Sequence, residues 1–258
     1  EREYSLQIRL PELDIDGPIL TFSTNPLPTG VPAFDFTAHQ PGKVSPGITF
    51  FGVEDGNTKN SQVSDKPLYI GVDESGYVVW YYADPTVSAR NDRQATMLEN
   101  GDILIALQTG FRVISIGGET VLNIGASGSP GGALHHDAIR LPDMSFVALG
   151  RETKTVDGAK LNGDLIIQLD STASQQLWSW NAFDHLDTSF MPGNLSQKVG
   201  KKNGAHDWTH ANAIEYLSAD KSFLVSLRHH NHVIKVNHES GNVAWKLGEQ
   251  GDFELTEG

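Results

Sequence analysis

One unit of strand, tight turn and strand recurs along this chain and constrains its fold more than any other feature. In each copy an apolar strand leads into a turn of Asp, Asn, Gly, Pro or Ser, and then into a second strand rich in Ile, Leu, Val and Phe. The three copies that align best are residues 97–107, 139–149 and 214–227. Further strand pairs, whose last strand carries a tryptophan, lie in residues 69–81, 165–180 and 233–245.

Four antiparallel strands that recur about every 40 to 50 residues, with an aromatic residue near the end of the fourth, are typical of the blades of a β-propeller. We therefore predict an all-β fold, a β-propeller of which about three to four blades are present in this chain. We expect Trp80, Trp180 and Trp245 to pack between blades. Because a propeller closes with more blades than this, and closure protects its sheet edges, we expect the sequence to be part of a longer one.

The first 45 residues differ from the repeat. Residues 4–10 alternate between apolar and polar, and the following stretch is interrupted by Pro18, Pro26, Pro28, Pro32 and Pro41. We predict N-terminal strands and a Pro-rich connector in residues 1–45, in a sandwich-like lead-in, and propeller blades in residues 46–258. Two inserts, 153–163 and 184–206, interrupt the repeat. Such inserts map to one rim of a propeller, often the binding rim.

Charge and composition exclude several classes of partner and site. The chain has 32 acidic and 19 basic residues and a formal net charge of −13, which repels nucleic acid and anionic membrane surfaces. No window approaches the roughly 18 to 20 apolar residues of a membrane span, so we expect a soluble chain without membrane insertion. It has no cysteine, which excludes disulfides, thiolate zinc sites and a Cys nucleophile. Against this acidic background, a cluster of His and Arg indicates a local site for an anion.

Such a cluster lies at corresponding places of two blades. When the repeats are aligned, the run that starts at His135 and His136 superposes on the run that starts at His210 and contains Asn212. Both runs begin the first strand of a blade, and the innermost strands of a propeller converge on its central channel. We therefore expect His135 and His210 to face one axis. The alternative is that these histidines only satisfy polar groups at strand starts.

A second part of the cluster follows on the neighbouring strand. Arg228 ends the second strand of the blade that His210 begins, which places it within a few residues' reach of His210. Its planar guanidinium suits an oxyanion, although an ion pair with one of the acidic residues on the rim is an alternative. Alternation along a strand would send His230 and His232 to one face and His229 to the other, so these histidines would not all bind one ion.

Three runs of this sequence resemble motifs of the bacterial arylsulfate sulfotransferase family, which is PAPS-independent. They are DWTHAN at 207–212, SLRHH at 226–230 and GNVAWKLG at 241–248, and the resemblance extends over residues 45–258. It implies a six-bladed propeller in which a channel histidine attacks the sulfur of an aryl sulfate, becomes transiently sulfated and passes the sulfuryl group to a phenol. This chemistry suits the cluster, because preorganised cations stabilise the charge that spreads over three sulfuryl oxygens.

The resemblance also assigns roles to residues. It implies that His210, Arg228 and the pair His135 and His136 hold the sulfuryl oxygens. We accordingly expect His135, His210 and Arg228 to be catalytic, and His136, His229 and Asn212 to bind substrate. The family's nucleophile lies in a later blade start, downstream of the segment that here reads WKLGEQGDF at 245–253. We therefore expect these 258 residues to lack the nucleophile, and to be inactive alone, unless His135 or His210 substitutes.

The resemblance implies no cofactor and no metal. It implies an aryl sulfate and a phenol as small-molecule partners and a periplasmic or secreted location, and it is compatible with a homodimer. Three other functions stay open. One is a metal-dependent propeller hydrolase that uses His135, His136 and Asp137, although no compact helical His spacing supports it. The others are a quinone-cofactor propeller, suggested by the run 241–245, and a non-enzymatic propeller scaffold that only binds.

Overall fold

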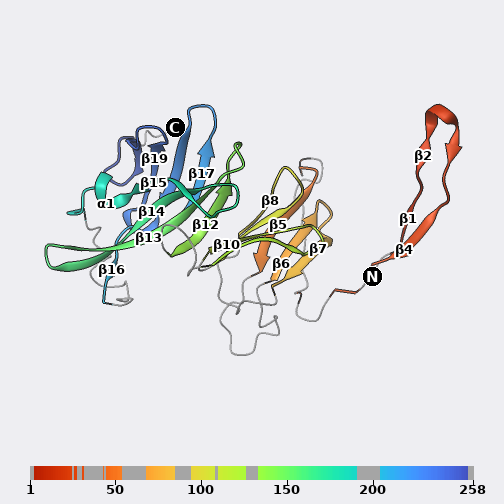
Figure 1. Ribbon diagram of the computed structural model, residues 1–258, viewed down its shortest axis with the longest axis horizontal. Helices are drawn as coiled ribbons and strands as arrows, with labels where there is room; N and C mark the ends of the chain where they lie inside the picture. Colours follow the sequence, from red (N-terminus) through yellow and green to blue (C-terminus); the bar gives the residue numbers. More distant parts are fainter. Residues whose placement is uncertain are drawn as a thin grey trace.

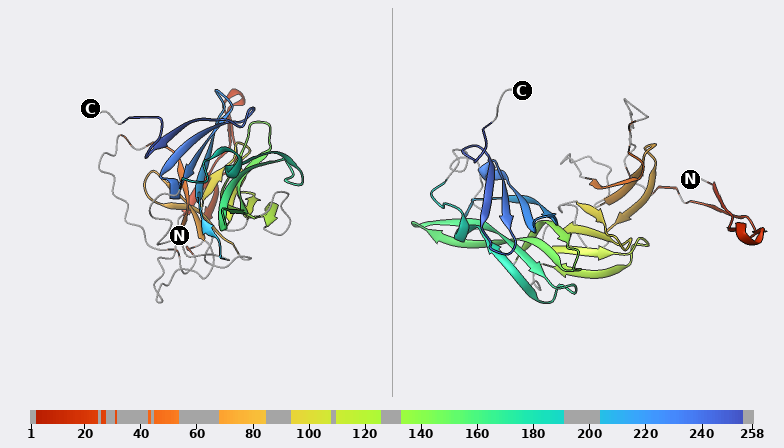
Figure 2. Two further views of the ribbon diagram at one scale, coloured as in Figure 1. Left: turned by 90° about the vertical axis from the view of Figure 1, so that its left-hand side faces the viewer. Right: turned by 90° about the horizontal axis from the view of Figure 1, so that it is seen from above.

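The computed structural model describes residues 3–24, 26–27, 31, 43, 45–53, 68–84, 94–107, 110–125, 133–190 and 204–254. Strands dominate these residues and form four successive antiparallel sheets, preceded by an N-terminal hairpin (Figure 1). Seen from above, the four sheets follow one another in an arc (Figure 2). The prediction of an all-β propeller with three to four blades in this chain is confirmed.

The N-terminal hairpin stands apart from the sheets in Figure 1. Strand β1 (Glu3–Leu6) pairs with β4 (Leu20–Ser23), and β2 (Arg9–Leu10) pairs with β3 (Ile15–Asp16) across the 3₁₀ turn η1 (Pro11–Leu13). All residues of these strands are exposed, because no second sheet of the described residues covers them. The described part of this segment is therefore one hairpin and not a sandwich.

The first two blades are β5–β7 and β8–β11. The first blade has three described strands, β5 (Ile48–Val53), β6 (Leu68–Asp73) and β7 (Val78–Ala83). The second has four, β8 (Ala95–Met97), β9 (Ile103–Leu107), β10 (Gly110–Ile114) and β11 (Thr120–Gly125).

The third and fourth blades complete the arc. The third contains β12 (Leu134–Arg140), β13 (Phe146–Val156), β14 (Ala159–Leu169) and β15 (Gln176–Asn181), with β16 (His206–Asp207) added parallel to β14. The fourth contains β17 (Ala211–Leu217), β18 (Ser222–Leu227), β19 (His232–Asn237) and β20 (Val243–Gly248). A short helix, α1 (Ala182–His185), follows β15, and a 3₁₀ turn, η3 (Arg228–His230), lies between β18 and β19.

The predicted insert at 153–163 is an extension of a hairpin. Strands β13 and β14 stay in register as far as the pair Val156 and Ala159, and Asp157 and Gly158 between them have φ values of 48° and 81°. A two-residue turn with two positive φ values matches the twist of its strands, and Asp-Gly is a preferred sequence for it. The insert therefore lengthens the blade without interrupting its pairing.

Three apolar cores hold the blades face to face. Tyr69, Ile103 and Ile105 belong to the first core, which joins the first and second blades. The second core joins the second and third blades around Phe111 and Phe146, and the third joins the last two blades around Trp180, Trp208 and Phe223. The two middle blades are covered on both faces by their neighbours. Burial of these apolar faces is the main source of the stability of the arc.

Of the three tryptophans predicted to pack between blades, two join neighbouring blades from the outermost strands. Trp80 Nε1 donates to the carbonyl of Ile116, at 2.8 Å, and Trp180 Nε1 donates to the carbonyl of Gly241, at 2.9 Å. In both cases the acceptor lies in the turn between the last two strands of the next blade. Trp245 of β20 instead packs edge to face on Phe253, with ring centroids 5.4 Å apart.

Candidate active site

The inner strands of the third and fourth blades both begin with a bulge. In β12 the pairs Leu134–Gly150 and Ala138–Ala148 enclose three residues against one, and in β17 the pairs Ala211–Leu227 and Ala213–Ser226 leave Asn212 unmatched. Bulges re-aim side chains and occur often beside active sites. Next to them, His136 and His210 have left-handed φ values of 59° and 52°, an uncommon conformation for residues other than glycine.

Four imidazoles form a continuous row at these bulges. The ring centroids of His135 and His136 lie 5.1 Å apart, those of His136 and His210 5.2 Å, and those of His210 and His229 4.6 Å. Residues of two blades that are about 75 positions apart in the sequence thus meet. The structure brings together four of the six residues predicted for the site.

His136, and not His135, lies against His210. The sequence alignment had superposed His135 on His210, but the larger bulge of β12 shifts the register there. His135 turns inward and is 7% exposed, with its Nε2 2.9 Å from Asp164 Oδ1 and 3.1 Å from the carbonyl of Gly150. His135 therefore supports the row from beneath, while half-buried His136 continues it.

A buried carboxylate that the sequence did not single out, Asp164 of β14, organises this region. It accepts hydrogen bonds from Thr209 Oγ1 and, at 2.6 Å, from the amide of Ala211, in addition to its contact with His135. Burial alone would raise the pKa of Asp164, but the hydrogen bond and charge of His135, with the other donors, hold it below its ordinary value. The charge of Asp164 thus fixes both histidine-bearing segments.

Asp207 plays the same part for His210 and His229. Its Oδ2 lies 2.6 Å from His210 Nδ1, and its backbone carbonyl lies 2.6 Å from His229 Nδ1. Burial would raise the pKa of Asp207, but the hydrogen bond and charge of His210 and the charge of Arg151 lower it overall. Burial chiefly lowers the pKa of His229, so its Nδ1 carries the proton toward the carbonyl and its Nε2 keeps a lone pair at neutral pH.

Arg228 lies beside this row but on a turn. The sequence predicted a continuing strand, whereas β18 ends at Leu227 and residues 228–230 form η3, closed by Asn231 with a left-handed φ of 53°. The amide of Arg228 donates to the carbonyl of His210, at 3.0 Å, and the residue is exposed. No ion pair joins its guanidinium to an acidic side chain in the described ranges.

The turn also separates the histidines that follow. His230 and His232 are buried against Phe190, with centroid distances of 5.2 and 5.5 Å, and His230 also packs on Trp208. His229 faces His210 instead. His230 and His232 thus lie together and His229 lies apart from them, and the cause is the 3₁₀ turn and not alternation along a strand. Asn212, the remaining predicted residue, is exposed beside His210.

The protein-family model described as Arylsulfotransferase (ASST) matches residues 36–257. The chain belongs to this family. Two solved structures are similar: a protein of unknown function from Bacteroides caccae and a europium-containing methanol dehydrogenase. The first is 15% identical, with a TM-score of 0.40 and coverage of 79% of this chain and 73% of that chain. The second is 12% identical, with a TM-score of 0.39 and coverage of 76% and 43%. No curated protein matches the chain.

In this member of the arylsulfotransferase family, one group of side chains has the spacing of a metal site. Asp207, His210 and His229 offer ligand atoms that lie within 4.8 Å of one another, and among the described residues no such group includes His135, His136 and Asp137. The charges of Arg151 and Arg228 act on Asp207 and His229, respectively. Two guanidinium groups and two carboxylates, those of Asp164 and Asp207, thus lie around the histidines, and the guanidinium groups offer donors suited to an anion. No helix in the described ranges is long and apolar enough to cross a membrane.

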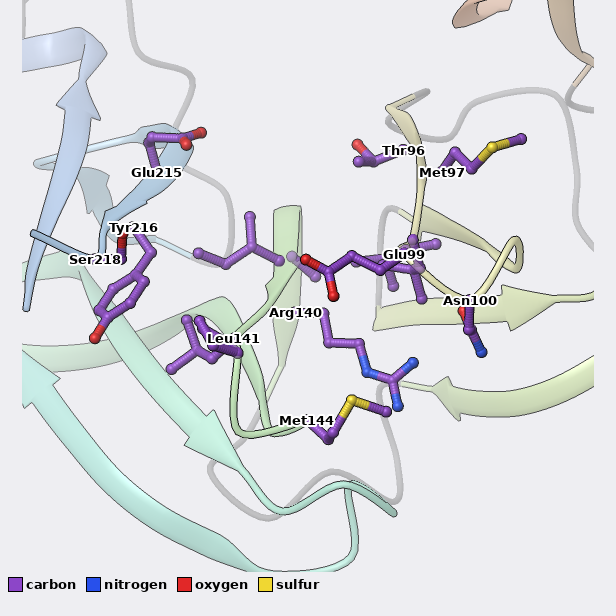
Figure 3. Close-up of a pocket in the computed structure, with 15 residues that line it drawn as sticks. Thr96, Met97, Glu99, Asn100, Arg140, Leu141, Met144, Glu215, Tyr216 and Ser218 are labelled. Carbon is purple, nitrogen blue, oxygen red and sulfur yellow. The ribbon is translucent and has the colours of Figure 1, made fainter.

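A cavity of about 610 Å³ lies at the other end of the inner strands (Figure 3). It is lined by the ends of β8, β12 and β17 and the turns after them, and none of the predicted site residues lines it. In Figure 3, Arg140 and Glu99 lie on one side of the space and Glu215 and Tyr216 on the other. The cavity and the imidazole row are therefore two separate features of the inner strands.

Proposed function

We propose that this chain takes part in the transfer of a sulfuryl group from an aryl sulfate to a phenolic acceptor, independently of PAPS. Membership of the arylsulfotransferase family supports this function. The observation that carries it is that three histidines of the row, His136, His210 and His229, lie next to exposed Arg228, whose amide donates to the His210 carbonyl and whose charge acts on His229. The guanidinium of Arg228 supplies hydrogen-bond donors and positive charge in an otherwise acidic chain, as an oxyanion requires.

The proposed reaction has two displacement steps. An imidazole nitrogen attacks the sulfur, the N–S bond forms, and the S–O bond to the aryl group breaks, so that the electron pair leaves with the phenolate. The oxygen of the acceptor phenol then loses its proton to a base and attacks the sulfur, and the N–S bond breaks to restore the neutral imidazole. This relay splits one displacement into two easier steps. The resemblance places the attacking histidine downstream of Phe253.

The residues of this chain then hold the transferred group. In the proposal, His210 and Arg228 donate to the sulfuryl oxygens, whose negative charge grows in the transition state. His136, His229 and Asn212 line the substrate beside them. His135 touches Asp164 rather than the row's open side, so it acts as a positioning residue. We extend the proposal to a periplasmic or secreted location, with small aryl compounds as the partners.

Titration calorimetry with 4-nitrophenyl sulfate on the 258-residue chain tests this function. We expect binding that weakens about tenfold or more in His210→Gln and in Arg228→Gln, because each variant loses a donor to an anion. His185→Gln, a change of an exposed histidine that stacks on Trp180, is the matched control and should bind like the wild type. Wild-type protein that binds no aryl sulfate, or unchanged affinity in both site variants, would overturn the proposal.

Transfer is measured on the same preparations, from the release of 4-nitrophenolate in the presence of phenol. Intact mass spectrometry after incubation with donor alone reports whether a sulfuryl group becomes attached to the chain. Binding without transfer or sulfation would favour a scaffold that only holds the ester. Activity that is lost after chelation and restored by zinc would favour the metal-dependent hydrolase.

A further inference from the structure

Arg151 follows directly after the residue that supports His135. Strand β12 pairs with β13 as far as Gly150, whose carbonyl contacts His135 Nε2, and β13 then continues with Arg151 opposite Asp164 of β14. Arg151 thus lies just beyond the point where the pairing of β12 with β13 ends, at the same end of β12 as the bulge that carries the histidines.

The Nε atom of Arg151 has no acceptor among the described residues. This atom is buried, and no ion pair involves the residue within the described ranges. The two nearby carboxylates are already engaged: Asp164 accepts from His135, Thr209 and Ala211, and Asp207 binds His210. A buried donor without an acceptor is costly, so it calls for a ligand that supplies one.

The repeat gives Arg151 the same place in its blade as a site residue has in the next. In the alignment of 139–149 with 214–227, Leu149 lies over Leu227, so Gly150 and Arg151 lie over Arg228 and His229. Both segments reach the same residue, because the charge of Arg151 acts on the Asp207 carboxylate and the Nδ1 of His229 donates to the Asp207 backbone carbonyl. Donors of the third and fourth blades therefore converge from two sides.

We propose that Arg151 is a further oxyanion-binding residue of this site, whose guanidinium donates to a terminal oxygen of a sulfate monoester. The ester oxygen supplies the acceptor that Nε lacks, and the monoanion is attracted by the positive charges of Arg151 and Arg228. The planar fork of arginine matches two oxygens of a tetrahedral anion better than the point charge of lysine does. This inference rests on the proposed function, since it names a residue that binds the same ester.

Calorimetric titration with 4-nitrophenyl sulfate tests it on four proteins: wild type, Arg151→Gln, Arg151→Lys and Arg140→Gln. Arg140 is the matched control, because its Nε is also buried without a partner but it lines the cavity at the other end of β12. We expect the dissociation constant to rise about ten- to hundredfold in Arg151→Gln and less in Arg151→Lys, and to stay unchanged in Arg140→Gln. Thermal unfolding shows that each variant is folded.

The outcomes separate this inference from the proposed function. If the wild type binds the ester and His210→Gln weakens it while Arg151→Gln binds like the wild type, the role of Arg151 is wrong and the site stands. Equal weakening in Arg140→Gln would also overturn it. If Arg151→Gln does not fold, Arg151→Lys decides, and wild-type affinity in that variant contradicts a forked contact. No binding by the wild type contradicts the proposed function itself.

Discussion

His210 Nδ1 lies 2.6 Å from Asp207 Oδ2, and the two side chains are similarly shielded, 18% and 19% exposed. The contact joins residues three positions apart, across a segment in which His210 has a left-handed φ of 52°. An imidazole that donates from Nδ1 to a carboxylate has a fixed ring orientation, and its Nε2 is directed away from the carboxylate. The contact thereby sets how His210 meets its neighbours in the row.

We predict that Asp207→Asn weakens the binding of 4-nitrophenyl sulfate about tenfold, which corresponds to about 1.4 kcal/mol. The amide has nearly the shape of the carboxylate, but it has no charge and only one accepting oxygen, so it holds the Nδ1–H of His210 less strongly. Calorimetry measures the effect. Asp220→Asn, which removes an exposed carboxylate paired with Lys235, is the control and should not change binding. Equal affinity in both variants would show that the orientation of His210 is set elsewhere.

The second prediction concerns stability. We expect Asp164→Asn to lower the free energy of unfolding by about 3 to 5 kcal/mol, because breaking a buried pair leaves its partner without compensation. Asp164 is buried and holds His135, Thr209 and the amide of Ala211, so its loss affects the third and fourth blades together. Urea unfolding followed by tryptophan fluorescence measures the change. A loss below about 1 kcal/mol would mean that the amide restores the same contacts.

The hairpins of the blades could be predicted from the sequence. The units 97–107, 139–149 and 214–227 are the observed hairpins β8–β9, β12–β13 and β17–β18, because turn residues and apolar runs act within about a dozen residues. The sequence also predicted that His135 and His210 face one axis, since inner strands converge on one channel, but the structure places His136 against His210.

The remaining details depend on contacts between distant residues. Asp164 looks like a turn residue in the run Asn-Gly-Asp, yet it lies within β14 because Thr209, 45 positions away, and Ala211 bond to it. The bulges in β12 and β17 differ in size, and an alignment of the two sequences does not show this difference. For this reason His136, and not His135, lies beside His210. Arg151 was missed because no motif marks it. Its position follows only from the pairing of β13 with β14.

The third prediction follows from the burial of His230, which with the charge of His232 lowers its pKa to about 4 from an ordinary 6.5. Below about pH 6.5 the unfolded chain binds a proton at this position that the native chain does not bind, so the contribution of His230 to stability falls as the pH drops from about 6.5 to 4, by about 3 kcal/mol for this group.

We expect His230→Phe to remove this loss while keeping a ring against Phe190 and Trp208. Urea unfolding at pH 7.0 and at pH 4.5 measures the difference in unfolding free energy. His185→Phe, at an exposed position, serves as the control and should keep the wild-type dependence. An undiminished loss in His230→Phe would assign the acid sensitivity to other groups.

The fourth prediction has the opposite sign and concerns Asp137, which links the inner strands of the last two blades. Its Oδ2 accepts from the amide of Ile214, at 2.9 Å, and its Oδ1 is buried without a partner in the described residues. Burial chiefly raises its pKa to about 6 from 3.8, so the native chain holds the proton more tightly than the unfolded chain does.

Stability should therefore fall as the pH rises from about 4 to 6, by about 3 kcal/mol for this group. Asp137→Asn keeps an oxygen for the amide of Ile214 and carries no charge, so we expect it to remove that decrease and to equal or exceed the wild type in stability at pH 7. We would measure the unfolding free energies of Asp137→Asn and of the double variant with His230→Phe between pH 4 and 7. These measurements check the opposite pH dependences of the Asp137 and His230 contributions. Since the two groups titrate in overlapping ranges with opposite effects, the wild-type profile should be flatter than that of either single variant. If a single variant has the wild-type profile, the group that it removes has the same pKa in the folded and unfolded chains.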